Sequence, residues 1–361
     1  MKKINLHGAG KVSNNSVVFM PEKNKIKISV CMPIYNNAQV IRPAVDSILA
    51  QKGAKFELIF VDNASTDGTT AILEQYCKKH PFARLVKKKK TTTVRENFND
   101  CVREAKGEYI AIFHGDDIYK PEIIAKEEKF LDAHPQIAAV FTESKIIRDD
   151  NVSKAFGYAG PLEKKKEIFT LCDVLRSLAL NSHNPLVSPT FMGRKSLLPP
   201  PPYFLDSDSF ASDIGFYLRI LEKHPVGILR EPLHYYRRSL SHGALKDVTS
   251  MQSQNPIFPI LDKYVRKHES WFSSDELNLY FLLKRSNLWL AAISAEAAGN
   301  PLLAKEIWEK SFSYSFLSSS IKYKQMWAKA AAAIVFDASK KIGLSGAFAK
   351  IVQNKRLSDA K

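Results

Sequence analysis

The sequence lacks the long apolar run that a membrane-spanning helix requires. No window of its 361 residues approaches ~18 uninterrupted apolar residues, although 45% of the residues are hydrophobic and 25% are charged. This composition is that of an ordinary globular protein with a real core, and the length predicts about two domains. The N-terminus, MKKINLHGAG, has two lysines and no apolar region behind them, so a signal peptide is not expected.

Cysteine is scarce, and acidic residues are outnumbered. The four cysteines (31, 77, 101 and 172) lack the paired spacing of a zinc site or a disulfide framework, which favours reduced thiols in a cytoplasmic protein. The chain has 37 acidic residues against 53 Lys and Arg, a formal net charge of +16. Nucleic acid, anionic lipid and a phosphate-bearing substrate are the partners that such a charge suggests. The lysines concentrate at positions 87–90 and in the tail from Lys322.

Two glycine-rich phosphate-binding motifs are also missing. No G-x-G-x-x-G follows the first predicted strand, and no G-x-x-x-x-G-K-[ST] occurs anywhere in the chain. Classical dinucleotide sites and P-loop sites are therefore disfavoured. Any nucleotide that binds must be held in another way.

Apolar strands alternate with amphipathic helices through the first third of the chain. The pattern predicts strands at 27–35, 56–62, 83–88 and 108–117, and helices at 38–51, 67–80 and 93–107. The strands are apolar on both sides, which is typical of a mostly parallel sheet covered by helices. Ligands of such sheets bind beyond the carboxyl ends of the strands.

Polar side chains collect at three of these predicted strand ends. They are Tyr35, Asn36 and Asn37 after the first strand, Asp62 and Asn63 after the second, and Asp116 and Asp117 after the fourth. Each alone would be an ordinary cap or turn residue, but the coincidence of three ends predicts a binding site at one edge. The adjacent carboxylates of Asp116 and Asp117 repel each other, and a hard divalent cation holding a diphosphate would remove that repulsion.

Three segments carry a family resemblance. ISVCMPIYNNAQVIRPAVDSILAQ, ELIFVDNASTDGTT and GEYIAIFHGDDIYKPE are similar, in this order, to motifs of the family 2 inverting glycosyltransferases with the GT-A fold, and the resemblance extends from Ile28 to Tyr236. It implies a Rossmann-like, mixed but mostly parallel sheet with helices on both faces. It also implies inverting transfer of a sugar from a nucleotide-sugar, for which we expect a UDP-sugar.

The resemblance implies roles for individual residues. Asp62 matches the aspartate that reads the nucleotide base, and Asp116 and Asp117 match the strand end that contacts the ribose and binds Mg²⁺ or Mn²⁺. His114 stands where the pattern Asp-x-Asp-Asp has its first aspartate. A neutral imidazole there can hydrogen-bond a ribose hydroxyl or bind the metal, and a merely structural histidine is the alternative. The other residues expected to bind the donor are Pro33, Tyr35, Asn37, Asn63, Arg95, Asn97 and Arg237.

A later segment supplies a candidate for the general base. Asp213 resembles the acidic residue that opens a helix with the pattern Asp-x-x-x-x-Leu-Arg, and it is the expected general base. Asp206 and Asp208 are the alternative candidates for the base. The structural alternative is that Asp213 only caps the helix. After it, PLHYYRRSLSHGA resembles a loop that closes over the donor. The candidates there for the diphosphate are His234, Arg237, Arg238 and His242.

The domain prediction has three parts: a polar leader at 1–25, a GT-A domain at 26–244 and a helical accessory domain at 245–361. Two helices are expected around Gly299, Asn300 and Pro301. In the following helix, apolar residues from Trp327 to Ile342 lie on one side, lysines including Lys329 and Lys340 lie opposite, and Phe336 interrupts the polar side. Such a helix can lie on an anionic membrane surface or pack on its own protein, and both alternatives stay open.

The sequence therefore predicts a metal-dependent glycosyltransferase that builds a cell-surface polysaccharide such as lipopolysaccharide. The expected acceptor is a glycan or lipid-linked hydroxyl, and the expected location is cytoplasmic or peripheral at the inner face of the membrane. A nucleotidyltransferase is an alternative, but CMPIYNN lacks the usual glycine-rich signature with a basic residue. A nucleic-acid-binding protein is another, but aromatic and basic residues do not interleave on a predicted sheet face, so no nucleic acid is expected as a partner.

Overall fold

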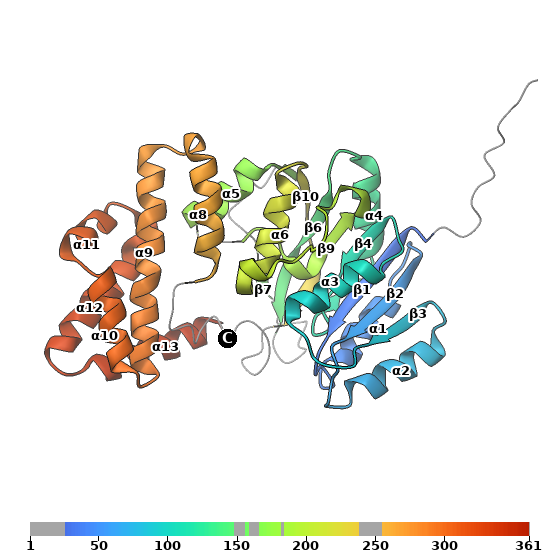
Figure 1. Cartoon of the computed structure of the whole chain (residues 1–361), viewed down its shortest axis with the longest axis horizontal. Helices are drawn as coiled ribbons and strands as arrows, with labels where there is room; N and C mark the ends of the chain where they lie inside the picture. Colours follow the sequence, from blue (N-terminus) through green and yellow to red (C-terminus); the bar gives the residue numbers. More distant parts are fainter. Residues whose placement is uncertain (1–25, 148–155, 159–165, 182–183, 238–254, 361) are drawn as a thin grey trace, which may run out of the picture.

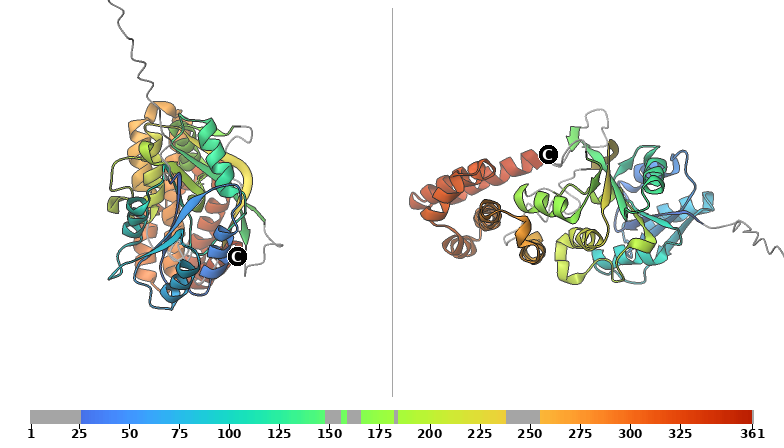
Figure 2. Two further views of the ribbon diagram at one scale, coloured as in Figure 1. Left: turned by 90° about the vertical axis from the view of Figure 1, so that its right-hand side faces the viewer. Right: turned by 90° about the horizontal axis from the view of Figure 1, so that it is seen from above.

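The computed structural model describes residues 26–147, 156–158, 166–181, 184–237 and 255–360. One end of the molecule is a sheet with helices against it, and the other end is a group of helices (Figures 1 and 2). The predicted leader, Arg238 and His242 lie outside the described residues. No helix in the described ranges combines the length and the hydrophobicity of a bilayer span.

The described strands form one mixed sheet of ten strands, in the order β3-β2-β1-β4-β9-β6-β10-β5, with β7 beside β6 and β8 beside β10. β1 to β4 pair in parallel, as do β6 and β10, whereas β9 is antiparallel to both β4 and β6. The prediction of a mostly parallel sheet is confirmed. The strands are β1 (Ile28–Ile34), β2 (Phe56–Asp62), β3 (Ala83–Lys87), β4 (Tyr109–Ile112), β5 (Ile118–Tyr119), β6 (Ala139–Ile147), β7 (Phe156–Tyr158), β8 (Ile168–Phe169), β9 (Phe191–Arg194) and β10 (Val226–Arg237).

Helices cover both faces of the sheet because successive strand residues point to opposite sides. Val30 and Met32 of β1 pack with α1, α2 and α4, whereas Cys31 packs with α3, α5, α6 and α8. The helices are α1 (Ile41–Leu49), α2 (Thr69–Lys79), α3 (Val94–Glu104), α4 (Ile123–Ala133), α5 (Leu171–Asn181), α6 (Ser212–Leu221), α8 (Ile257–Lys267), α9 (Ser274–Ala297), α10 (Pro301–Ser311), α11 (Tyr314–Ile321), α12 (Trp327–Lys341) and α13 (Ser345–Ala360).

The C-terminal helices have a core of their own, in which Leu283, Trp289 and Trp308 are buried. α9 begins with a capping box between Ser273 and Glu276. The predicted turn after it is confirmed, since the Asn300 side chain caps α10, which starts at Pro301. α8 packs in the core of the sheet region instead. The predicted division at residues 244 and 245 stays a prediction.

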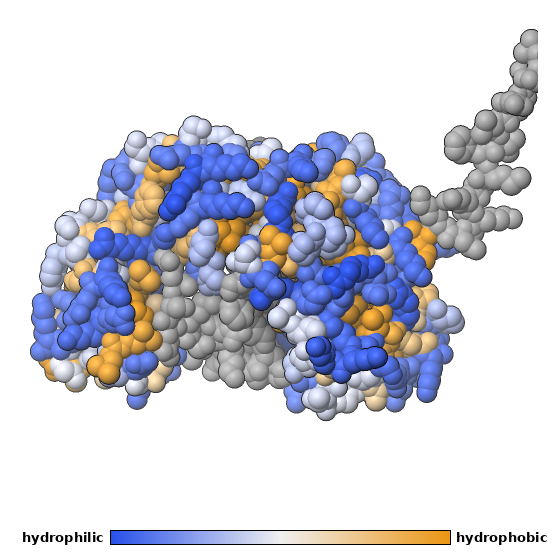
Figure 3. Space-filling view, in the orientation of Figure 1, coloured by the Kyte–Doolittle hydropathy of each residue, from blue (hydrophilic) through white to orange (hydrophobic). Residues whose placement is uncertain are grey.

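The surface differs between the two ends. In the view of Figure 3, hydrophilic side chains cover much of the molecule, and hydrophobic areas lie between them at both ends, one of them at the lower left, over the C-terminal helices. Exposed large apolar residues are concentrated in the same part of the chain: Phe281, Leu302, Tyr314, Ile321, Trp327, Ile334, Val335, Ile342, Leu344 and Ile351 are exposed.

Candidate active site

β1 and β2 end side by side, with Ile34 paired to Asp62. The Asp62 carboxylate is buried. Its Oδ1 accepts hydrogen bonds from Ser65 N (3.0 Å) and Ser65 Oγ (2.6 Å), and its Oδ2 accepts one from Thr70 Oγ1 (2.5 Å). These bonds close the turn between β2 and α2. The proposed contact of Asp62 with a nucleotide base would be made in addition to them.

The turn after β1 is shaped by its own asparagines. Asn36 has a positive φ of 50°, and its Oδ1 accepts from Thr66 N (2.8 Å). Asn37 Oδ1 accepts from Tyr35 N (3.1 Å), which leaves the Tyr35 ring 47% exposed at the edge of the sheet. Pro33 lies inside β1, opposite Val61. Tyr35 is therefore an exposed aromatic residue at the carboxyl end of β1.

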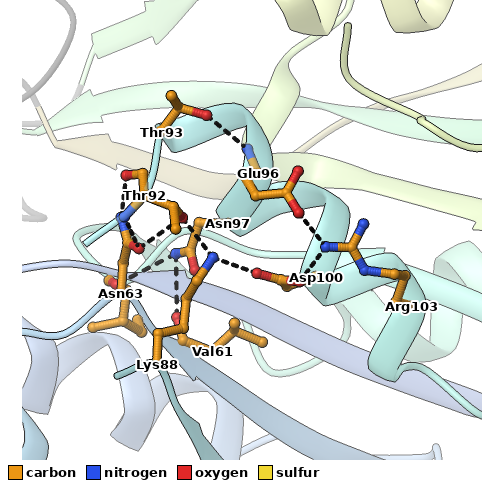
Figure 4. A network of polar contacts seen from close by, with 10 residues as sticks. Val61, Asn63, Lys88, Thr92, Thr93, Glu96, Asn97, Asp100 and Arg103 are labelled. Atoms are coloured by element: carbon orange, nitrogen blue, oxygen red, sulfur yellow. Dashed lines mark hydrogen bonds and ion pairs between the residues drawn. The ribbon is translucent and has the colours of Figure 1, made fainter. Parts of the chain in front are cut away.

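Asn63 and Asn97 fix the neighbouring loop (Figure 4). Asn63 Nδ2 donates to Thr92 O (2.9 Å), and its Oδ1 accepts from Thr92 N (2.9 Å). Asn97 Nδ2 donates to Val61 O (3.2 Å), whereas its buried Oδ1 has no hydrogen-bond partner among the described residues. Lys88 joins the same network through Thr92 and Asp100. Both asparagines thus hold the backbone in place at the site's edge.

The carboxylates near α6 have different surroundings. Asp206 is 84% exposed and pairs with Arg95 (Nε to Oδ1, 2.8 Å). Asp208 pairs with Arg219 (3.0 Å). Both aspartates belong to a 3-10 helix, Asp206–Ala211, that precedes α6. Asp208 is thereby committed to a partly buried ion pair, and Arg95 reaches the 3-10 helix that precedes α6.

His114, Asp116 and Asp117 form the centre of the site. Each offers one ligand atom, and these three atoms lie within 4.8 Å of one another. Arg237, at the end of β10, joins them: its backbone N donates to Asp117 Oδ1 (2.7 Å), and its Nε donates to Asp116 O (2.6 Å). The structure thus brings together residues that are about 120 positions apart in the sequence.

His234 contacts this cluster from the protein interior. It is fully buried on β10, its Nδ1 lies 2.8 Å from Ser144 Oγ, and its Nε2 lies 3.1 Å from Asp117 Oδ2. Burial lowers the pKa of His234 to about 3, so the imidazole is neutral. The structure therefore places His234 against Asp117 and away from solvent. Sequence reasoning missed Ser144, which lies on the separate strand β6 and follows no motif.

The three residues fit a divalent cation. His114 Nε2 is buried and has no hydrogen-bond partner within the described residues, and the buried Asp117 Oδ2 has the neutral imidazole of His234 as its neighbour, 3.1 Å away. Burial raises the pKa of Asp117 to about 6, and burial together with the Asp117 charge does the same for Asp116. A cation would meet the unsatisfied ligand atoms and offset the charge repulsion. Carboxylate oxygens suit Mg²⁺ and Mn²⁺, and an imidazole nitrogen favours Mn²⁺ of the two.

Asp213 lies in the first turn of α6, beside Ser188. Ser188 in turn contacts Tyr217 through their hydroxyl oxygens (2.8 Å). Phe191 of β9 is paired with Ile112 at the carboxyl end of β4, so the segment just before β9, which includes Ser188, lies at the edge that carries His114. Burial raises the pKa of Asp213 above its ordinary value. This direction suits a group that must take up a proton.

The sequence of this chain is similar to those of known proteins. Residues 29–198 match the family model of Glycosyl transferase family 2. EpsE of Bacillus subtilis is 37% identical over 130 residues, which is 36% of this chain and 47% of EpsE. An uncharacterized protein of Mycobacterium bovis is 29% identical over 223 residues, 60% of each chain. This chain therefore spans about 60% of the length of the first relatives that it matches.

Solved structures agree on the architecture. S. aureus TarS 1-349 in complex with UDP-GlcNAc has a TM-score of 0.50 and 18% sequence identity, covering 78% of this chain and 88% of TarS 1-349. At this identity the likeness shows the fold. Together with the family match, the sheet order and the strand-end carboxylates define a GT-A domain. Residues 29–198 therefore form a glycosyltransferase family 2 domain.

Proposed function

We propose that this protein transfers a sugar, with inversion, from a UDP-sugar to a hydroxyl group and that it needs Mg²⁺ or Mn²⁺. The observation that carries the proposal is the cluster of His114, Asp116 and Asp117 at the carboxyl edge of the sheet, whose ligand atoms lie within 4.8 Å of one another and include the buried, unpaired Nε2 of His114. When bound there, the cation would neutralise the diphosphate of the donor. TarS, which shares the fold, is known with UDP-GlcNAc.

The protein's own groups would hold the donor in place. Arg237 adds a positive charge next to Asp116 and Asp117, and Tyr35 offers an exposed ring at the end of β1. Asp62, Asn63, Arg95 and Asn97 shape the neighbouring turn and loops, so in this proposal Asn63 and Asn97 act mainly by holding the backbone that faces the nucleotide. Pro33 and Asn37 shape the end of β1 in the same way.

Asp213 is the proposed general base. As the acceptor oxygen attacks the anomeric carbon, the bond from that carbon to the diphosphate breaks, and the Asp213 carboxylate takes the hydroxyl proton. Its place beside Ser188, at the same edge as His114, supports the assignment. The pKa of Asp213 is raised and therefore lies closer to neutral pH than the pKa of an ordinary aspartate. This makes its carboxylate a better proton acceptor.

The acceptor that we propose is a glycan or lipid-linked hydroxyl in the synthesis of a cell-surface polysaccharide, at the inner face of the membrane. One relative supports this class: poly(ribitol-phosphate) beta-glucosyltransferase of Bacillus spizizenii is 34% identical over 112 residues, although these cover only 17% of that protein.

Calorimetry with UDP and UDP-sugars, in Mn²⁺ and in EDTA, tests the donor and the metal together. We expect binding in Mn²⁺ that EDTA removes and that Asp117→Ala abolishes. A matched variant, Asp206→Ala, removes an exposed carboxylate outside the cluster and should bind like the parent in both buffers. Equal affinity with and without EDTA would refute the metal requirement, and the absence of binding to every nucleotide-sugar tried would refute the donor.

A further inference from the structure

The outward side of α12 is a continuous apolar stripe. Trp327, Ile334, Val335 and Ile342 are between 47% and 69% exposed, and Ala331 and Ala338 are exposed between them. These positions recur at the spacing of one helix face, and at a rise of 1.5 Å per residue they extend over roughly 22 Å. We call these six residues the α12 stripe.

The opposite side of α12 fastens the helix to the protein. Ala330, Ala333 and Phe336 are buried, and the Phe336 ring packs edge-on against Trp308 with ring centroids 4.8 Å apart. Phe336, which interrupts the polar side in the sequence pattern, is thus the anchor of the helix. Lys329 also faces inward, and burial lowers its pKa to about 8. The side of α12 that includes Lys329 therefore packs against the rest of the protein, and the α12 stripe stays uncovered.

Positive charge surrounds the stripe. Between Phe312 and Lys355 the chain has seven lysines and a single acidic residue, Asp337. Lys322 and Lys324 precede the first turn of α12, Lys341 lies in its last turn, and Lys350 and Lys355 follow in α13. All five of these lysines are exposed. Lys322 pairs with Asp275 and Lys341 with Asp337, whereas Lys324, Lys350 and Lys355 have no ion pair within the described residues. Long lysine side chains can lie along apolar surface and keep their charge at its rim.

We infer that the α12 stripe is a contact surface for an anionic lipid membrane, with the lysines around it binding the headgroups. Apolar side chains that include a tryptophan, bordered by lysines, are the combination by which a helix lies in a membrane interface. This surface would hold the enzyme at the membrane where the proposed reaction takes place, and only its biological purpose rests on the proposed function. It is tested without donor or acceptor, so its failure and that of the sugar transfer are distinguishable.

A lipid surface fits this face better than a second copy of the chain. Two copies joined through the α12 stripe would bring two sets of lysines together, with Asp337 as the single acidic residue of each stretch to offset them. An anionic bilayer neutralises the same lysines. In the views of Figures 1 and 2, α13 leads away from α12 and ends near β7, which pairs with the second half of β6. The two helices thus extend from the stripe toward the sheet.

Flotation of the full-length protein with vesicles tests the inference. The vesicles contain either phosphatidylcholine alone or phosphatidylcholine with 30% phosphatidylglycerol. We expect partitioning onto the anionic vesicles only. Ile334→Ser/Val335→Ser should reduce it at least tenfold, and Lys324→Glu/Lys350→Glu should do the same at low salt. Removing the helices would expose Trp308 and other core residues, so point substitutions in exposed positions are the better probe.

Two matched controls isolate the surface. Leu302→Ser removes an 82% exposed apolar side chain from α10, and Lys78→Glu/Lys79→Glu makes the same charge change on α2; both should partition like the parent. Thermal unfolding and light scattering establish that each variant is folded and what its oligomeric state is. Three results would overturn the inference. The first is a parent protein that does not bind anionic vesicles at all, and the second is a loss of vesicle binding in the control variants as large as that in the stripe variant. The third result is a parent protein that is a dimer and binds no vesicles, with a stripe variant that is a monomer.

Discussion

His234 Nε2 lies 3.1 Å from Asp117 Oδ2, and both side chains are closed off from solvent. The imidazole is held from its other side by Ser144, so it has little freedom to turn. Since Asp117 Oδ1 is held by the backbone N of Arg237, the carboxylate is fixed at both oxygens. The orientation of this candidate metal ligand is therefore set by β6 and β10, which follow it in the sequence.

His234→Gln should weaken Mn²⁺-dependent nucleotide binding by about 10- to 100-fold, the usual cost of losing a residue that orients a metal ligand. Calorimetry in Mn²⁺ and in EDTA measures the effect, and His134→Gln, at the C-cap of α4 and outside the cluster, is the control. Ser144→Ala should have a smaller effect in the same direction, because the imidazole remains. If His234→Gln lowers the affinity equally in EDTA, the residue does not act through the metal.

His114 should bias the site toward Mn²⁺. An imidazole nitrogen binds Mn²⁺ better than Mg²⁺, whereas carboxylates accept both. We expect His114→Asp to narrow the ratio between nucleotide affinity in Mn²⁺ and in Mg²⁺, measured by calorimetry. An unchanged ratio would mean that His114 does not bind the metal and is a structural residue packed against Phe98.

Asp213→Asn should leave donor binding intact and slow transfer by about 10²- to 10⁴-fold, because general-base assistance is lost while the size of the side chain is kept. The measurements are nucleotide-sugar affinity and turnover with acceptor. Transfer at the parental rate would assign the base elsewhere, and Asp206 would be the next residue to substitute, since Asp208 is held by Arg219.

The pH dependence of turnover provides a second test of Asp213. Burial raises its pKa, and only the ionised carboxylate can accept a proton. The rate should therefore fall as pH decreases through a midpoint above the ordinary aspartate value of about 3.9. Because Asp116 and Asp117 also have raised pKa values, the profile should be recorded at saturating donor and Mn²⁺, where their protonation no longer limits binding.

Glu127→Gln should change how stability depends on pH. Glu127 is fully buried in α4, neither of its carboxylate oxygens has a hydrogen-bond partner among the described residues, and burial raises its pKa well above the ordinary value. Above about pH 4.3 the unfolded chain releases a proton that the folded protein keeps, so this residue destabilises the fold increasingly as pH rises toward its folded pKa. The Tm difference, variant minus parent, should grow between pH 5 and pH 8. A constant difference would contradict this explanation.

Much of the first part of the sheet, β1 to β4 with their helices, was predictable from the sequence. Runs such as FELIFVD are short, apolar on both sides and followed by polar turns, and these local features identify a buried parallel strand and its carboxyl end. The same reasoning placed Asp62 and Asp117 at one edge, because parallel strands end together. The antiparallel strand β9 has no such signal, since both strands with which it pairs, β4 and β6, contribute residues more than 50 positions earlier in the sequence.

The supporting contacts of the site were not predictable. Asn63 looks like a ligand-binding residue in the sequence, yet its amide is used by the backbone of Thr92, 29 residues later. Ser144 and His234 meet across 90 residues. Ser144 belongs to no motif, and the segment that contains His234 predicted a contact with the diphosphate, whereas the structure places His234 against Asp117. Phe336 was recognised as an irregularity of the polar side of its helix, but only the position of Trp308 shows that it is an anchor. Such contacts depend on which elements become neighbours, and local patterns do not contain that information.

Helix α9 takes part in two hydrophobic cores. Tyr280, in its first third, is buried with the sheet region, whereas Trp289 and Ile293 are buried among the C-terminal helices. A helix that melts at one end loses the hydrogen bonds that support the other, so the two cores should be lost together. Calorimetric unfolding should then show one cooperative transition, with the van't Hoff enthalpy equal to the measured enthalpy. Evolution would accordingly have to exchange the accessory helices at a point within α9 or beyond it, and not between β10 and α8.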